Sequence, residues 1–134
     1  MTDVLIASDA DWIIEDVKAA LVAPGVDIRV VRAGKQVRAQ VEAKTPDLVI
    51  LDLQIGNMGG MATCLDLRLE SGAGRLPHVP VLMLLDRPAD VFLAQQSDAE
   101  GWLVKPLDAI RLRAAIMALL AGETHHESQT AGLS

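Results

Sequence analysis

A run of four apolar residues at positions 48–51, reading Leu-Val-Ile-Leu, constrains the fold of this chain more than any other feature. The run follows Pro46 and Asp47 and stops at a carboxylate, Asp52. A short strand that is apolar on both faces is typical of a parallel sheet covered by helices. Asp52 is therefore expected at the carboxyl end of a central strand, the edge where open parallel sheets bind ligands. In the alternative interpretation, Asp52 only begins a turn.

Apolar runs alternate with amphipathic stretches along the whole chain. The apolar runs predict strands at residues 4–7, 26–31, 48–51, 79–85 and 101–104. Apolar residues spaced three or four apart, together with capping residues, predict helices at residues 12–22, 34–43, 61–69, 90–97 and 108–121. This alternation predicts an α/β fold, a doubly wound five-stranded parallel sheet of order 2-1-3-4-5, flavodoxin-like, between two layers of helices.

Length and composition limit the organisation of the chain. Its 134 residues are enough for one domain, expected over residues 1–122, and the polar, aperiodic residues 123–134 are expected to form a disordered tail. The net charge of −6, with no basic cluster, argues against direct nucleic-acid binding. No apolar run is long enough for membrane insertion. The single cysteine, Cys64, suits a cytoplasmic location and is expected in the core.

Three of the predicted strands end at ionisable residues. Asp9 follows the first strand, Asp52 the third and Lys105 the fifth. In the order 2-1-3-4-5 these strand ends lie close together, so we expect the three side chains to converge. Paired carboxylates suit a hard cation such as Mg²⁺, and an aspartate beside a metal and a lysine can act as a nucleophile toward phosphorus. Taken singly, Asp9 could instead cap a helix, and Lys105 could be a solvated loop residue.

The sequence resembles the receiver domain of bacterial two-component response regulators over almost its whole length. The matching segments are VLIASDAD at the start, PDLVILDLQIGNMGGM in the middle, VPVLMLL in the fourth strand and EGWLVKPLD near the end. The resemblance implies that Asp52 is the phosphoacceptor of a sensor histidine kinase and that Lys105 contacts the phosphoryl oxygens. It also implies that Asp9, Asp52 and the backbone carbonyl of Gln54 bind Mg²⁺, and that the Lys105–Pro106 bond is cis.

Five positions bear on how far the chain follows this pattern. Ser8 stands where the family has an acidic residue, so the metal site loses one charge, although the hydroxyl could hold a metal-bound water. Leu85 replaces a Thr or Ser and cannot hydrogen-bond a phosphoryl group. Trp102 takes the aromatic switch position of the family. It could couple to phosphorylation, or it could simply fill space in the core. Gly56 replaces a proline, and Asp86 is interpreted as a helix cap rather than a group facing the site.

Two functions fit these features. The first, which we prefer, is a single-domain response regulator that is not an enzyme. It accepts a phosphoryl group on Asp52 and signals by binding a downstream protein, because 134 residues leave no room for a DNA-binding domain. The second is a phosphorylation-independent pseudo-receiver that acts as a protein interaction module, which Ser8 and Leu85 favour. A flavin-binding protein of the same fold is disfavoured by the acidic loop at residues 8–11. The identity of the partners and the formation of a homodimer stay open.

Overall fold

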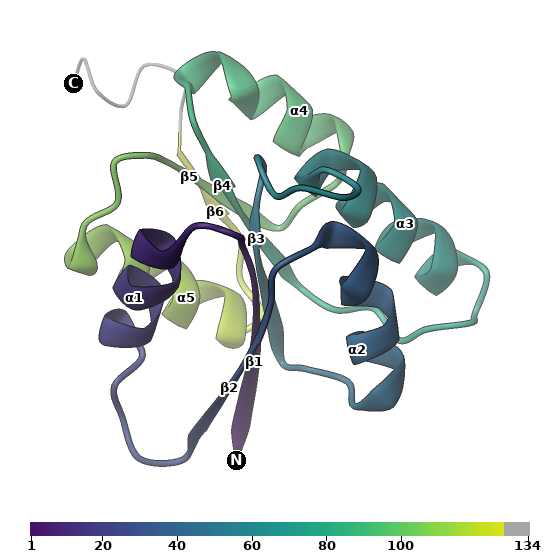
Figure 1. Ribbon diagram of the computed structural model, residues 1–134, viewed down its shortest axis with the longest axis horizontal. Coiled ribbons are helices and arrows are strands. Elements are labelled where there is room, and N and C mark those ends of the chain that lie inside the picture. Colours follow the sequence, from purple (N-terminus) through teal and green to yellow (C-terminus); the bar gives the residue numbers. More distant parts are fainter. Residues whose placement is uncertain (128–134) are drawn as a thin grey trace.

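The computed structural model describes residues 1–127 and contains one sheet between two layers of helices (Figure 1). The strands are β1 (Thr2–Ala7), β2 (Val26–Val31), β3 (Leu48–Asp52), β4 (Val81–Leu85), β5 (Gly101–Val104) and β6 (His125–His126). The helices are α1 (Asp11–Ala20), α2 (Val37–Ala43), α3 (Gly60–Gly72), α4 (Val91–Gln96) and α5 (Ala109–Leu120), with 3-10 turns η1 (Gly34–Gln36) and η2 (Pro88–Asp90). Every predicted element is present, with small shifts at its ends.

The sheet has the order β2-β1-β3-β4-β5-β6, and all neighbouring strands are parallel. The predicted doubly wound α/β fold with the order 2-1-3-4-5 is therefore confirmed, and β6 is an addition at the edge. The register places Ala7 opposite Leu51, and Asp52 opposite Leu84. The carboxyl ends of β1, β3 and β4 consequently lie at one edge of the sheet, and β5 ends there too.

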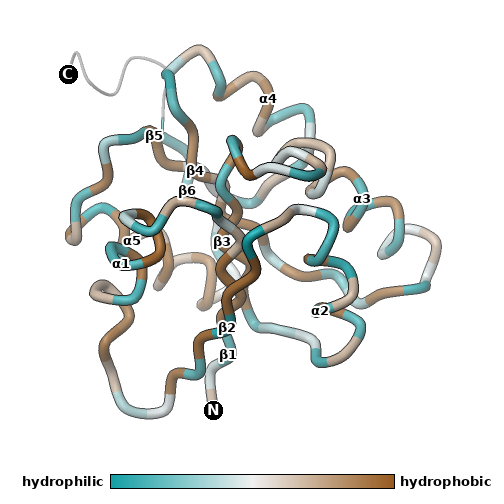
Figure 2. The backbone as a smooth tube through the Cα atoms, in the orientation of Figure 1, coloured by the Kyte–Doolittle hydropathy of each residue, from teal (hydrophilic) through white to brown (hydrophobic). Residues whose placement is uncertain are grey.

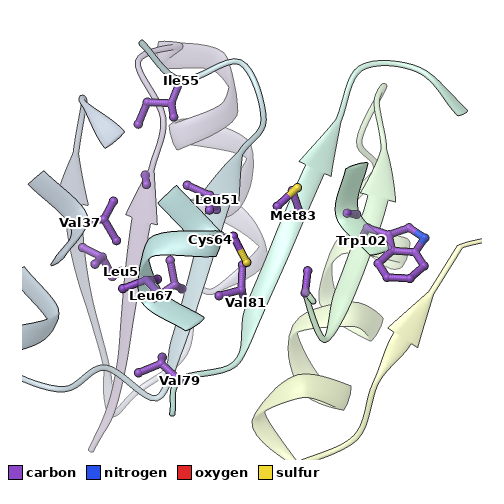
Figure 3. Packing of buried hydrophobic residues seen from close by; sticks show 14 of the residues in the cluster. Leu5, Val37, Leu51, Ile55, Cys64, Leu67, Val79, Val81, Met83 and Trp102 are labelled. Carbon is purple, nitrogen blue, oxygen red and sulfur yellow. The ribbon is translucent and has the colours of Figure 1, made fainter. Parts of the chain in front are cut away.

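Alternate residues of the strands point into two separate apolar layers. Ile50 and Leu84 pack with α1 and α5, whereas Leu51 and Met83 pack with α2, α3 and α4. The central strands are hydrophobic along their length in Figure 2, and Figure 3 shows part of the second layer. All five residues of β3 are buried. A strand that is buried along its whole length therefore positions Asp52.

The fourth strand begins at Val81, two residues later than its apolar run predicts. Pro80 has no N–H group to donate to a neighbouring strand, although its carbonyl oxygen accepts a bond from the Val49 N–H at 3.0 Å. The apolar run at residues 79–85 therefore indicates which residues are buried. The start of β4 depends instead on which residues can pair with a neighbouring strand.

Cys64 lies on α3 and is fully buried, as its apolar neighbours predict. Its Sγ atom lies 3.2 Å from the carbonyl oxygen of Ser97. Burial raises the pKa of the Cys64 thiol to about 11. The thiol is therefore protonated near neutral pH and is a poor nucleophile.

Residues 123–127 are ordered rather than forming the start of the predicted disordered tail. The chain turns back after α5 at Gly122, whose φ of +83° lies in the left-handed region that favours glycine. His125 and His126 then pair with Gly101 and Trp102 of β5. This segment is polar, so its own composition gives no sign of order; its partners are distant residues. The disorder expected for residues 128–134 falls outside the described part of the chain.

None of the helices within residues 1–127 has the length and apolar character that crossing a bilayer requires. The longest, α3, has 13 residues, against about 20 for a typical membrane-spanning helix.

Candidate functional site

Asp52 ends β3 at the carboxyl edge of the sheet, and its side chain is 2 % exposed. Both carboxylate oxygens have partners. Oδ1 accepts hydrogen bonds from the Lys105 ammonium at 2.8 Å and from the Gln54 backbone N–H at 3.1 Å. Oδ2 accepts from the Ser8 hydroxyl at 2.9 Å. These three partners satisfy both oxygens of a carboxylate that is almost fully removed from solvent.

Lys105 follows β5 directly, and the predicted convergence with Asp52 is observed. Its ammonium group lies between two carboxylates, 2.8 Å from Asp52 Oδ1 and 3.0 Å from Asp86 Oδ1. Its backbone N–H donates to the Leu85 carbonyl at 2.7 Å, which fixes the end of β5 against the end of β4. The Lys105–Pro106 peptide bond is cis, as the resemblance to receivers predicts.

Asp86 faces the site, so its interpretation as a helix cap is wrong. The N-cap of the η2 turn is Arg87, and Asp90 provides the reciprocal capping contact. With the cap supplied one residue later, the side chain of Asp86 is free to pair with Lys105. Two carboxylates therefore share one ammonium group at this edge of the sheet.

Trp12 is a site residue that the sequence reasoning missed. The Lys105 ammonium lies 5.9 Å from the centre of the Trp12 ring, at the outer limit of a cation–π contact. Trp12 lies in the first turn of α1, which begins at the same edge of the sheet. Its position just after the first predicted strand could have indicated that it lies near Asp52 and Lys105. The ring is half exposed, so its fluorescence can report events at the site.

Asp9 is exposed and hydrogen-bonds to the loop after Asp52. Its Oδ2 accepts from the Gly56 N–H at 3.0 Å. It does not cap the first helix, because the N-cap residue of α1 is Ala10 and no side chain bonds there. A proline at position 56, the usual residue of the family, has no N–H and could not make this contact. The exchange to glycine thus links Asp9 to the β3–α3 loop.

Ser8 is fully buried at the end of β1. Its oxygen accepts from the Ala10 N–H at 3.1 Å while its hydroxyl donates to Asp52 Oδ2. The backbone contact fixes the direction of the hydroxyl. Ser8 therefore gives Asp52 a neutral donor in the place where the family pattern has a second acid.

The loop between β3 and α3 is tightly fitted around the site. Asn57 and Met58 both have positive φ angles, of 51° and 75°. A Cβ atom on Gly60 would lie 2.7 Å from the Asp52 carbonyl oxygen, and one on Gly34 would lie 1.7 Å from the Met58 carbonyl oxygen. Both glycines are required for this close approach of backbone segments.

The donors at the site suit a hard cation but are fewer than the family pattern provides. Within residues 1–127 no group of three His, Cys, Asp or Glu side chains gathers as a metal centre. The structure brings the Ser8 hydroxyl to the Asp52 carboxylate, and the Gly56 N–H holds the Asp9 carboxylate at the loop that follows Asp52. The Gln54 carbonyl is the third donor that the resemblance to receivers implies. Carboxylate, carbonyl and hydroxyl oxygens are ligands that Mg²⁺ accepts, so the residues fit the ion with reduced negative charge.

Leu85 and Trp102, the two positions expected to couple to phosphorylation, are both buried. Leu85 is 0 % exposed and packs in the same apolar layer as Val91 and Ala94 of α4. Trp102 is 4 % exposed and lies at one end of the side chains drawn in Figure 3. Its indole Nε1–H donates to the Glu127 carbonyl oxygen at 2.7 Å. Trp102 therefore has a specific polar partner in addition to filling space.

Known proteins resemble this chain in sequence. It is 33% identical over 119 residues to the DNA-binding response regulator MtrA of Mycolicibacterium smegmatis, covering 87% of this chain and 50% of MtrA. It is 32% identical over 121 residues to the transcriptional regulatory protein CseB of Streptomyces avermitilis, covering 89% of this chain and 49% of CseB. The chain thus spans about half the length of the curated relatives it matches.

Solved structures give the same result. The chemotaxis response regulator CheY4 of Vibrio cholerae is 25% identical, with a TM-score of 0.77 over 89% of this chain and 98% of that chain. A signal receiver domain of a signal transduction histidine kinase from Syntrophus aciditrophicus is 28% identical, with a TM-score of 0.79 over 91% and 92%. The sequence model of the response regulator receiver domain matches residues 4–117. This chain belongs to the response regulator receiver domain family.

Proposed function

We propose that this receiver domain accepts a phosphoryl group on Asp52 from a phosphohistidine of a sensor histidine kinase. The P–N bond of the donor breaks, a P–O bond to an Asp52 oxygen forms, and the released imidazole takes up a proton. The observation that carries the proposal is the pairing of Lys105 Nζ with Asp52 Oδ1 at 2.8 Å, at the edge where the strands end.

The residues around Asp52 have distinct tasks in this transfer. The Lys105 side chain is 11 % exposed and carries its charge on a flexible stem. Its ammonium group can therefore shift from the Asp52 carboxylate to the phosphoryl oxygens. The N–H of Gln54 and the hydroxyl of Ser8 orient the carboxylate before transfer. Asp9, Asp52 and the Gln54 carbonyl would hold Mg²⁺, with Ser8 acting through a water. When bound, the ion offsets the negative charge that accumulates on the transferred group.

We propose that the output is contact with a downstream protein, through the face formed by α4, β5 and α5. The net charge of −6 supports a protein partner over direct DNA contact by this domain. The DNA binding in the name of MtrA belongs to a protein of which this chain covers half. We assign no DNA contact to the receiver domain on that basis.

Phosphorylation can be tested with acetyl phosphate and Mg²⁺ on the purified chain. Intact mass spectrometry should show the gain of one phosphoryl group, and beryllofluoride should change Trp12 fluorescence. Asp52→Asn should abolish both results, whereas Asp47→Asn, the same change five residues earlier in the chain, should not. Phosphorylation of Asp52→Asn, or of neither protein, contradicts the assignment.

A pseudo-receiver is the second candidate, favoured by the contacts of Asp52 and Lys105. Ser8 and Lys105 already satisfy Asp52, Asp86 also holds Lys105, and Leu85 has no hydroxyl to offer. Such a site is stable without metal or phosphate. If Asp52→Asn leaves the binding of the downstream protein and the cellular phenotype unchanged, this second function replaces the first.

A further inference from the structure

The outer edge of β5 is covered by a very short strand. Within the described residues 1–127, only His125 and His126 pair with it, opposite Gly101 and Trp102, and the His125 N–H donates to the Glu100 carbonyl oxygen at 3.2 Å. Figure 1 shows β6 lying alongside β5 at this side of the sheet. A strand edge offers N–H and C=O groups that any extended segment can use, whether from the same chain or from another.

A carboxylate binding position lies just beyond this edge, and Glu127 occupies it. Arg111 of α5 donates to Glu127 Oε2 from Nε at 2.8 Å and to Oε1 from Nη2 at 2.6 Å. The Val104 N–H donates to Oε1 at 2.8 Å. Arg111 is itself fixed by the carbonyl oxygens of Val104 and Pro106, each at 2.9 Å. This fork of donors recognises a carboxylate with defined geometry.

An aromatic surface adjoins the carboxylate position. The imidazole ring of His126 stacks on the indole of Trp102, with 4.1 Å between centroids and 2° between ring planes. The indole Nε1–H donates to the Glu127 carbonyl oxygen. In Figure 3 the Trp102 ring lies at the end of the apolar layer, beside β6. Trp102, Val104 and Arg111 together favour an extended segment with a planar ring followed directly by an acidic residue.

The two sides of this contact, β5 with α5 and segment 123–127, differ in how firmly they pack against the rest of the domain. Trp102, Val104 and Arg111 belong to β5 and α5, which pack against the core of the domain. The segment 123–127 has no large apolar side chain, and Glu123, Thr124 and His126 are exposed. Local opening starts from segments with few buried apolar contacts, so segment 123–127 can leave while β5 and α5 stay folded.

We propose that the outer edge of β5 is a docking site for an extended segment of a partner protein, with a planar ring followed directly by a carboxylate, and that residues 123–127 are its intramolecular competitor. The partner segment adds to β5 as a parallel strand, stacks on Trp102 and places its carboxylate on Arg111 and Val104. No atom of Asp52 takes part. The site lies on the α4–β5–α5 face proposed above for output, and the inference rests on that proposal by naming the segment that the face binds. Because the peptide test does not involve Asp52, its outcome is separate from that of the phosphorylation test.

Competition between the two segments can be measured with the full chain. The probe is a fluorescently labelled peptide, Glu-Thr-His-His-Glu, with both ends blocked, and binding is followed by fluorescence polarisation. The tethered segment competes at a high effective concentration, so wild-type protein should bind the peptide weakly. Glu127→Lys places a cation beside Arg111 and opens the edge, and should bind the peptide at least about tenfold more tightly.

Matched variants separate this effect from a change of net charge. Glu123→Lys makes the same charge change in the same segment, at an exposed side chain, and should bind like wild type. Glu127→Lys combined with Arg111→Gln should lose the gain, as should a peptide that ends in Gln. Asp52→Asn should bind like wild type. Thermal unfolding confirms that each variant is folded.

Three results would overturn the proposal. One is equal peptide affinity of wild type and Glu127→Lys. Another is peptide binding by the folded double variant, Glu127→Lys with Arg111→Gln, that is as tight as binding by Glu127→Lys alone. The third, from light scattering, is a dimer of the wild-type chain that the peptide dissociates, because the occupant of the edge is then a second copy of this chain.

Discussion

Ser8 donates its hydroxyl hydrogen to Asp52 Oδ2 across 2.9 Å, at the position where the family pattern has an acid. The exchange replaces repulsion between two carboxylates with a neutral hydrogen bond. Asp52 is thus stabilised without a metal ion, while the charge available to attract one is reduced. Substitutions at and around Asp52 therefore test the proposed binding of Mg²⁺ and of a phosphoryl group.

Ser8→Asp should increase the affinity for Mg²⁺, by about tenfold, because a third carboxylate joins Asp9 and Asp52. Without Mg²⁺ the same substitution should lower the free energy of unfolding, since two buried carboxylates then repel. Titration of Trp12 fluorescence with Mg²⁺, and thermal unfolding with and without the ion, measure the two effects. Ser8→Asn, neutral and larger than serine, should gain no Mg²⁺ affinity, and any loss of stability from overpacking this buried position should be the same with and without the ion. Equal Mg²⁺ affinity in all three proteins would contradict the expected role of Ser8.

Asp86→Asn should favour binding of a phosphoryl analogue, because Asp86 competes for the Lys105 ammonium at 3.0 Å. The Asp86 side chain is 35 % exposed, and ion pairs open to solvent contribute about 0.2 to 1 kcal/mol, so a gain of about 1.4- to fivefold is expected. Beryllofluoride titration of Trp12 fluorescence measures it. Asp27→Asn removes the same charge from an exposed residue of β2 and should leave the affinity unchanged; an equal gain there would point to net charge as the cause.

Leu85→Thr should restore a hydrogen bond to the phosphoryl group. A hydrogen bond to a charged group contributes about 1.5 to 3 kcal/mol, so beryllofluoride should bind at least about tenfold more tightly. Leu85 is fully buried, so the loss of methyl groups should lower the free energy of unfolding by about 1 to 3 kcal/mol. Trp102 fluorescence in a Trp12→Phe background measures the coupling. Leu85→Val loses similar volume but adds no hydroxyl, and a matching gain in affinity for that variant would rule out this explanation.

Cys64 should make the protein less stable in alkaline solution. Burial raises the thiol pKa from 9.0 to about 11, so between these values the unfolded chain loses the proton while the folded chain keeps it. The free energy of unfolding should fall as pH rises through this window, by about 2.7 kcal/mol at most. Urea unfolding at pH 8 and at pH 11 should show a smaller fall for Cys64→Ala than for wild type. If the free energy of unfolding falls equally with pH in wild type and Cys64→Ala, burial does not raise the pKa of the thiol.

The fold could be predicted because its central strands β3 and β4 are contiguous apolar runs. Burial on both faces requires this pattern, and β3 has it without interruption. The convergence of Asp52 and Lys105 was predictable for the same reason, since strand order alone brings the ends of β3 and β5 to one edge. Their positions directly after predicted strands were enough to predict that these two residues meet.

Side-chain direction and long-range order were not predictable from local sequence. Asp86 is of a residue type that often caps helices. Because Arg87 is the N-cap of η2, the Asp86 side chain pairs with Lys105 instead. Residues 123–127 have the composition of a tail, and they are ordered by Trp102 and Arg111, which lie outside any local window. In both cases a contact between distant residues outweighs local preference.

Two backbone hydrogen bonds join the loop after β2 to the loop after β3. The Gly34 N–H donates to the Gly56 carbonyl at 3.0 Å, and the Lys35 N–H donates to the Asn57 carbonyl at 2.8 Å. Immobilising a loop costs conformational entropy, about 1 to 2 kcal/mol per residue. Here that loss is already incurred when the polypeptide folds, so an ion or phosphate arriving beside Asp52 meets a preorganised cradle and keeps more of its binding energy.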